Sequence, residues 1–228
     1  MSTNQPANYD RLASVYAFSE YLTFGSQLVK CREAWLAEVR TCQNILLLGD
    51  GDGRFSTRLL EGTSTTQLVS LDASLSMLTV ARNRRKKREA SDDRITNLHC
   101  DILQWSAPPH KFDAVVAQFF FDSFDQETLK KIVAKLKTTL EPTGRLVVSE
   151  FNIPKDTRIG NLRGRFTLGI LYPLFKLITK LQTRQLADYR SLLMNQGFHL
   201  KNEVYFSQKT LVSQIFRLES NAQREISL

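Results

Sequence analysis

Short apolar runs alternate with helix-like segments along most of this 228-residue chain. The run NILLLG at residues 44–49 is apolar at consecutive positions, which is typical of a strand buried on both faces of a parallel sheet. A helical pattern follows directly, and the alternation repeats further along the chain. Strand and helix in regular succession predict an α/β fold with a doubly wound, mostly parallel sheet.

The expected elements can be placed by residue number. Strands are expected at residues 44–49, 67–72, 94–100, 112–118, 145–151, 198–206 and 211–218. Helices are expected at residues 54–60, 73–88 and 126–140, and in a short segment that ends at residue 195. Only the turn SQKT separates the last two strands, so they must pair antiparallel. The pattern therefore predicts a seven-stranded Rossmann-like sheet with an antiparallel final strand.

The formal net charge of +8 favours acidic partners, such as an anionic membrane surface, an acidic carrier protein or nucleic acid. Much of the excess lies in the run ARNRRKKRE at residues 81–89. Cations are favoured at a helix C-terminus, and no aromatic residues interleave with these charges. We therefore interpret the run as a solvated helix end and expect no nucleic-acid partner.

Cysteine spacing and terminal sequence indicate the compartment. Three cysteines without paired spacing favour a reducing environment, and the polar start MSTNQPANYD lacks the features of a signal peptide. No apolar run is long enough to span a bilayer, and no ligand spacing suggests a metal site. We expect a cytoplasmic protein without a metal. The apolar segment at residues 166–181 leaves a peripheral membrane contact open.

The glycine-rich loop GDGDG at residues 49–53 follows the first expected strand. In a doubly wound sheet such a loop lies beyond the carboxyl ends of the strands, where ligands bind. Asp72 ends the second strand about 20 residues later, the spacing at which an acid accepts hydrogen bonds from a ribose. Together they predict a nucleoside site.

The loop differs from the dinucleotide fingerprint GxGxxG, because Arg54 stands where that pattern needs its third glycine. Asp50 and Asp52 would repel a pyrophosphate at close range, whereas a cationic ligand would tolerate them. S-adenosylmethionine carries a ribose, a sulfonium and an ammonium group. We therefore predict it as the cofactor.

The sequence here resembles the class I S-adenosylmethionine-dependent methyltransferases. Their loop commonly reads VLDLGxGxG, which ILLLGDGDG at residues 45–53 matches. Acids follow the second and third strands in that family, and the resemblance places the second of them, Asp101, near the adenine amino group. The predicted cofactor contacts are Gly49, Asp50, Gly51, Gly53, Asp72, Ala73, Asp101, Ile102 and Gln118.

Both flanks are similar to the ubiquinone/menaquinone C-methyltransferase group. YDRLASVYAFSEYLTFG at residues 9–25 looks like that group's amino-terminal lid, which implies that Tyr16 closes over the cofactor. GRLVVSEFNIP and LYPLFKLI resemble its fifth strand and the insertion that follows. We expect a single domain made of a helical lid, a cofactor-binding core, a helical substrate-side insertion and a terminal hairpin, at residues 1–43, 44–152, 153–196 and 197–228.

The predicted function is methyl transfer to a small aromatic or lipophilic acceptor, free or carrier-bound. A base is needed only if the acceptor must lose a proton, and the candidate catalytic residues are Asp122, Glu150 and Tyr16. The aromatic stretch QFFFDSF at residues 118–124 has two interpretations, core packing and an aromatic wall beside the substrate. The oligomeric state is not readable from the sequence.

Two other functions stay open. The ending GDG also resembles aminopropyltransferases, which bind decarboxylated S-adenosylmethionine in the same fold. A degenerate domain that binds partners without catalysis is the third possibility. It rests on Leu47, which occupies the position where the family usually has an acid that helps to hold the methionine ammonium group.

Overall fold

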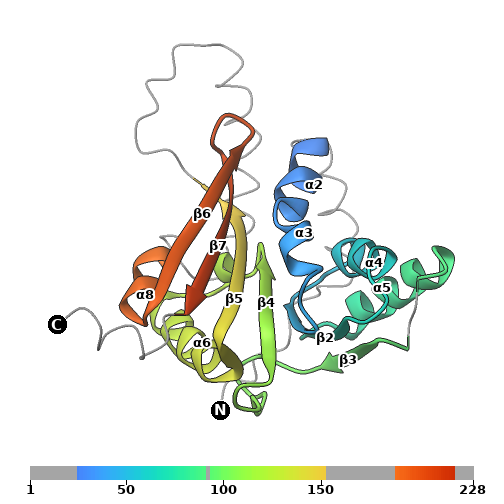
Figure 1. The fold of residues 1–228 in the computed structure, drawn as a ribbon, viewed down its shortest axis with the longest axis horizontal. Coiled ribbons are helices and arrows are strands. Elements are labelled where there is room, and N and C mark those ends of the chain that lie inside the picture. The colour runs from blue at the N-terminus through green and yellow to red at the C-terminus, as the bar shows by residue number, and fades with distance from the viewer. Residues whose placement is uncertain (1–24, 91–92, 153–187, 219–228) are drawn as a thin grey trace, which may run out of the picture.

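The computed structural model describes residues 25–90, 93–152 and 188–218. Parts of the predicted lid, insertion and terminal hairpin lie outside these described residues. Within them, a central sheet carries helices on both faces (Figure 1).

Seven strands form one sheet in the order β3-β2-β1-β4-β5-β7-β6. Their bounds are β1 Asn44–Leu48, β2 Gln67–Asp72, β3 Ile95–His99, β4 Phe112–Gln118, β5 Leu140–Phe151, β6 Phe198–Phe206 and β7 Leu211–Leu218. The strands β1 to β5 run parallel, and β7 is antiparallel to both of its neighbours. The predicted fold class and antiparallel final strand are confirmed. The strand order reverses between β1 and β4, which creates a switch point at the carboxyl edge.

One face of the sheet is covered by α3 (Leu36–Val39) and α4 (Arg54–Glu61). Apolar side chains of these two helices pack on alternate residues of β1, β4 and β5. Intervening apolar residues of these strands, such as Leu46, Val115 and Val148, belong to a second cluster on the opposite face. The strand β1 is therefore buried on both faces, as its continuous apolar run predicts.

The opposite face is covered by α6 (Gln126–Thr139) and α8 (Tyr189–Asn195), on the other side of the strands from α4 in Figure 1. Four apolar side chains of α6 are fully buried there, Leu129, Ile132, Val133 and Leu136. The helix begins at its predicted residue because Asp125 caps it, with Oδ1 accepting a hydrogen bond from the Thr128 amide at 2.7 Å.

Two further helices border the carboxyl edge. The helix α5 (Leu75–Lys87) begins two residues later than predicted, because Ser74 acts as its N-cap and accepts a hydrogen bond from the Met77 amide. The helix α2 (Ser26–Glu33) packs Leu28 and Cys31 against the ends of β5 and β7.

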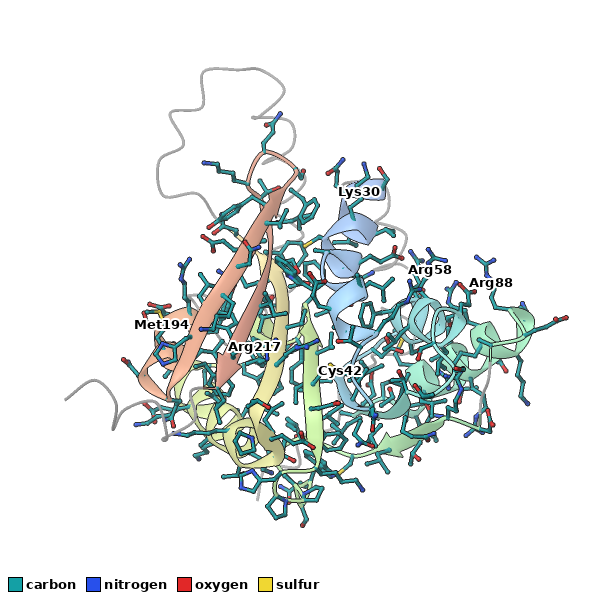
Figure 2. All side chains as sticks on the ribbon, in the orientation of Figure 1. Lys30, Cys42, Arg58, Arg88, Met194 and Arg217 are labelled. Carbon is teal, nitrogen blue, oxygen red and sulfur yellow. The ribbon has the colours of Figure 1, made fainter. Side chains whose placement is uncertain are left out.

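The basic run at the end of α5 is only partly the solvated helix end that the sequence predicts. Lys86, Lys87 and Arg88 are exposed, and Arg88 points outward in Figure 2. Arg85 is fully buried, and Arg84 contacts the glycine loop. The solvated interpretation is wrong for these two arginines, because this part of α5 lies against the loop and its carboxylates.

The helices α4 and α5 approach each other closely at Gly53. A Cβ atom built on Gly53 would lie 2.6 Å from Cβ and 2.7 Å from Cα of Ala81. Gly53 also has a φ of +76°, a conformation that a side chain disfavours. This glycine therefore serves the close helix packing that the third glycine serves in dinucleotide-binding loops.

Gly53→Ala is expected to lower the free energy of unfolding by about 2–4 kcal/mol, because overpacking adds to backbone strain. Gly51→Ala is the matched control, since Gly51 has a similar φ of +60° but its Cβ would approach no described atom more closely than 4.0 Å. For the control we expect a loss of about 1 kcal/mol. Urea denaturation measures both, and equal losses would contradict the packing role.

Candidate functional site

The predicted cofactor residues lie at the carboxyl ends of β1, β2, β3 and β4. These strands are neighbours in the sheet, and backbone hydrogen bonds extend the pairing beyond their ends. The Gly49 amide donates to the Leu71 carbonyl at 2.9 Å, and the Cys100 amide donates to the Asp72 carbonyl at 3.1 Å. The sheet therefore brings the four loops to one edge, at the switch point.

The glycine loop exposes bare backbone at this edge. Gly49, Gly51 and Gly53 all have positive φ angles, between 60° and 76°. A Cβ on Gly49 would lie 2.7 Å from Cδ2 of Phe120, whereas a Cβ on Gly51 would enter open space among the described residues. The backbone at Gly51 can therefore be approached closely by a ligand, which fits the predicted cofactor.

Asp72 is a half-buried carboxylate beside this loop. Its Oδ1 accepts a hydrogen bond from the Ser74 amide at 2.8 Å. Burial raises the pKa of Asp72, while backbone hydrogen bonds from Ser74 and Gly51 and the nearby His99 oppose the shift. Its second oxygen can accept from a ligand hydroxyl. Ala73 follows directly and is exposed, with its carbonyl 3.1 Å from Nε2 of His99.

The loop after β3 is fixed by Lys135 of α6, a residue that the sequence did not suggest. Asp101 is exposed, and its Oδ1 accepts from the Leu103 amide at 2.8 Å, while Ile102 is buried. Nζ of Lys135, on α6, donates to the carbonyls of Ile102, Leu103 and Trp105 at 2.8, 3.1 and 2.7 Å. One lysine among the four of an amphipathic helix carries no sequence signal for this role.

Gln118 connects β4 to α2. Its Nε2 donates to the Arg32 carbonyl at 2.7 Å. The Arg32 guanidinium carbon lies 5.1 Å from the centre of the Phe119 ring. The amide of Gln118 is therefore occupied by a protein contact, and its predicted cofactor contact stays a prediction.

The loop carboxylates face arginines of the protein. Arg84 donates from Nε to the Asp52 carbonyl and from Nη2 to Asp52 Oδ2, both at 2.8 Å. Arg54 also contacts Asp52 Oδ2 at 2.8 Å. The charge of Asp52 is thus compensated within the protein, so the argument that it selects a cationic ligand is wrong.

Asp50 points into the protein between α4 and α5. Its Oδ1 accepts from the Ser56 amide at 3.3 Å, and its Oδ2 is buried without a hydrogen-bond partner among the described residues. Burial raises the pKa of Asp50 to about 6, while Ser56 and the positive charge of Arg85 oppose the shift. Arg85 is itself buried and donates to Ser56 Oγ at 3.3 Å and Asn97 Oδ1 at 3.1 Å.

The candidate catalytic residues differ in how far their side chains are exposed to solvent. Glu150 is only 2% exposed at the end of β5. Asp122 is half-buried in the turn after β4 and accepts from Ser123 Oγ at 3.4 Å. Tyr16 lies outside the described residues.

The phenylalanine stretch is divided between the core and the carboxyl edge, and the aromatic wall beside a substrate stays a prediction. Phe121 is a core residue, 1% exposed, with its ring centre 6.0 Å from that of Tyr189. Phe119 and Phe120 are half-buried at the carboxyl edge. Phe119 has a φ of +52° and packs its ring 4.8 Å from that of Phe151. A strained non-glycine residue of this kind is often found at functional sites.

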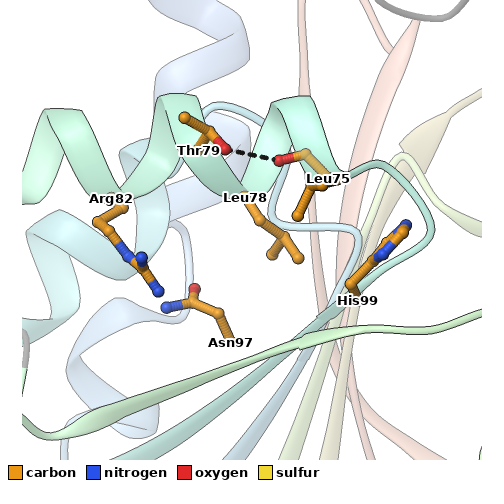
Figure 3. Close-up of a pocket in the computed structure, with 6 residues that line it drawn as sticks. All are labelled: Leu75, Leu78, Thr79, Arg82, Asn97 and His99. Atoms are coloured by element: carbon orange, nitrogen blue, oxygen red, sulfur yellow. Dashed lines mark hydrogen bonds between the residues drawn. The ribbon is translucent and has the colours of Figure 1, made fainter.

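A shallow groove of about 130 Å³ lies between α5 and β3 (Figure 3). Its lining residues are Leu75, Leu78, Thr79, Arg82, Asn97 and His99, none of which belongs to the predicted cofactor contacts. In the described parts of the chain, no group of acidic, histidine and cysteine side chains is arranged to hold a metal ion. No helix of those parts has the length and apolarity to cross a membrane.

A family model described as a methyltransferase domain matches residues 45–144. A demethylmenaquinone methyltransferase of Thermus thermophilus is 34% identical over 140 residues, which cover 61% of this chain and 61% of that protein. A ubiquinone/menaquinone biosynthesis C-methyltransferase of Dinoroseobacter shibae is 27% identical over 64% of this chain and 56% of its own length. The chain thus matches about three fifths of the length of these relatives.

The fold also occurs among solved structures. An N-methyltransferase of Bradyrhizobium japonicum, solved with S-adenosyl-L-homocysteine, aligns with a TM-score of 0.59 at 16% identity. The alignment covers 95% of this chain and 93% of that one. At this identity the likeness concerns the fold, which is the Rossmann-like fold of methyltransferases.

Arg84→Met is expected to loosen the glycine loop, because it removes both contacts with Asp52. Amide hydrogen exchange at Gly51, Asp52 and Gly53 should become about tenfold faster, since local opening becomes easier. Lys87→Met is the control, since it removes the same charge from an exposed position of the same helix. Equal exchange rates in the two variants would show that Arg84 does not hold the loop.

Asp50→Asn is expected to change how stability depends on pH. The folded pKa of Asp50, about 6, lies above that of an unfolded aspartate, so its stabilising contribution is complete at low pH and is lost as pH rises through 6. Between pH 4 and 7.5 the wild type should lose about 2 kcal/mol relative to Asp50→Asn. Urea denaturation at each pH measures this, and a difference independent of pH would refute it.

Proposed function

We propose that this chain, whose residues 45–144 match a methyltransferase domain, is a class I S-adenosylmethionine-dependent methyltransferase that transfers a methyl group to a small aromatic or lipophilic acceptor. The observation that carries the proposal is the meeting of Gly51, Asp72 and Asp101 at one edge of the sheet, beside exposed parts of Phe119 and Phe120.

The cofactor side follows from the chemistry of these groups. Asp72 accepts hydrogen bonds from the ribose hydroxyls, and Asp101 accepts from the adenine amino group. The backbone at Gly49 and Gly51 lies along the methionine part of the cofactor. The charge of Asp50 is directed toward α4 and α5, so backbone carbonyls take the place of the family's usual acid at Leu47 in holding the ammonium group.

S-adenosylmethionine, when bound, supplies a methyl group that is already activated on its sulfonium. The chain then has to align the acceptor with that methyl group and exclude water. Asp122 is the better candidate base for an acceptor that must lose a proton, because it is half-buried at the carboxyl edge. Burial raises the pKa of Glu150 well above its ordinary value, which disfavours the charged form that a base requires.

The aromatic side chains support the choice of acceptor. Phe119 and Phe120 are half-buried at the carboxyl end of β4, and we expect a flat acceptor to contact the ring surface that the protein leaves uncovered, beside the cofactor. The two curated relatives are named for demethylmenaquinone and for ubiquinone/menaquinone biosynthesis. A quinone-like or phenolic acceptor, which is flat and lipophilic, is therefore the first class to test.

We also propose a cytoplasmic protein of one domain, with residues 1–43 as a lid and 153–196 as a substrate-side insertion. All three cysteines are free, which supports a reducing compartment. A lipophilic acceptor is compatible with a peripheral membrane contact of the insertion.

Asp72→Asn is expected to weaken S-adenosylmethionine binding about 10- to 100-fold, because a charged acceptor for the ribose is lost while the side-chain oxygen that accepts from the Ser74 amide is retained. Calorimetric titration with S-adenosylmethionine and S-adenosylhomocysteine measures this. Glu127→Gln, an exposed change on α6, is the control and should bind like the wild type.

The outcomes separate the candidate functions. Preference for the decarboxylated cofactor would indicate aminopropyl transfer. A folded wild type that binds none of the three compounds would exclude both enzyme functions and support a degenerate binding domain.

A further inference from the structure

Glu150 is a buried carboxyl group at the carboxyl end of β5, a position where acids often perform catalysis. It is 2% exposed, and its Oε2 is buried without a hydrogen-bond partner among the described residues. Its side chain lies on the face covered by α6 and α8, because it alternates with Leu146 and Val148 of that core.

The other carboxyl oxygen is fully used. Oε1 of Glu150 accepts hydrogen bonds from two consecutive backbone amides, those of Phe120 at 3.1 Å and Phe121 at 2.8 Å. The preceding amide, of Phe119, donates to the Ser149 carbonyl at 2.7 Å. The end of β5 thus accepts hydrogen bonds from three successive backbone amides of the turn after β4. These hydrogen bonds fix the backbone path of the turn.

The Phe120 ring depends on this turn. It packs so closely on the glycine loop that a Cβ on Gly49 would lie 2.7 Å from its Cδ2. On its other side, the ring lies edge-on to Phe124, with centres 5.1 Å apart. A change in the course of the turn would therefore move the ring relative to the cofactor loop.

We propose that Glu150 is a positioning residue, which holds the Phe120 ring against the glycine loop through the two amides that its Oε1 binds. The inference deepens the proposed function, since the ring then borders both the cofactor and the acceptor. It assigns Glu150 a role other than the base suggested by its place after the fifth strand. Accepting two amides requires an oxygen but no negative charge, so a neutral carboxyl or amide group suffices.

The test compares Glu150→Gln with Glu150→Ala in the full chain. The glutamine oxygen can accept the same two amides, so we expect affinity for S-adenosylhomocysteine within about twofold of the wild type. The alanine variant leaves both amides unpaired, and its affinity should fall about tenfold. Calorimetry measures affinity, and thermal unfolding confirms that each variant is folded. Loss of binding in the glutamine variant equal to that in alanine would overturn the proposal.

A double-mutant cycle tests whether Glu150 acts through the ring. Phe120→Leu should weaken binding by a similar factor, and combining it with Glu150→Ala should add little, because both changes disturb one contact. Fully additive losses would overturn the proposal. If Glu150→Ala does not fold, Glu150→Gln decides alone, and a loss of about tenfold in S-adenosylhomocysteine affinity in that variant would overturn the proposal.

A measurement without ligand separates this inference from the proposed function. In the wild type, the amides of Phe120 and Phe121 should exchange slowly with solvent, and in Glu150→Ala about tenfold faster. Unchanged exchange of these two amides would refute the positioning role of Glu150, even if the cofactor binds. If the wild type binds no cofactor but Glu150→Ala still speeds the exchange of the two amides, the proposed function is refuted and the positioning role of Glu150 is retained.

Discussion

Burial of β1 on both faces and pairing along both edges constrain the rest of the carboxyl edge. The strand β1 is enclosed on both faces and along both edges. The chain turns sharply at its end, at Gly49, and the Gly49 amide still donates a hydrogen bond to β2. The next helix then starts almost at once and packs against α5 at Gly53. The bare backbone of the loop is thus required by packing at Gly49 and Gly53, and it is free for a ligand at Gly51.

The two aspartates of the loop have their explanation within the protein. Asp52 is paired with arginines, and Asp50 is buried near another, so the loop is fastened to α5 by charge as well as by close packing. Burying a charged group such as Arg85 is costly unless polar partners surround it, and Ser56 and Asn97 provide two. The loop carboxylates therefore serve to attach the loop to α5, and they do not identify the ligand.

Much of the architecture was predictable because hydrophobic periodicity is local. The bounds of β2, β4, β6 and β7 agree with the predicted ranges, while β5 starts at Leu140, earlier than expected, because its first residues continue the pairing with β4 irregularly. Side-chain partners were not predictable in the same way. Helical spacing places Arg85, but not Lys86, on the same face as the buried Leu78 and Ala81. That a charged side chain is buried there was not predictable, because it depends on the partners that α4 and β3 supply. The sequence likewise did not show which of the three phenylalanines enters the core and which lie at the carboxyl edge, because this depends on the backbone path of the turn after β4.

The Gln118 contact helps to divide the carboxyl edge into two parts that are held by different elements, the phenylalanine turn and the glycine loop. The turn that carries the phenylalanines is fastened to β5 and, through Gln118 and Arg32, to α2, whereas the glycine loop is fastened to α5. The two assemblies touch where the Phe120 ring meets Gly49. Substitutions in α2 therefore act on the aromatic side through Gln118, and the Phe120 ring passes the change on to the glycine loop at Gly49. The side chain at position 120 is therefore the point through which sequence changes on one half of the carboxyl edge are felt by the other.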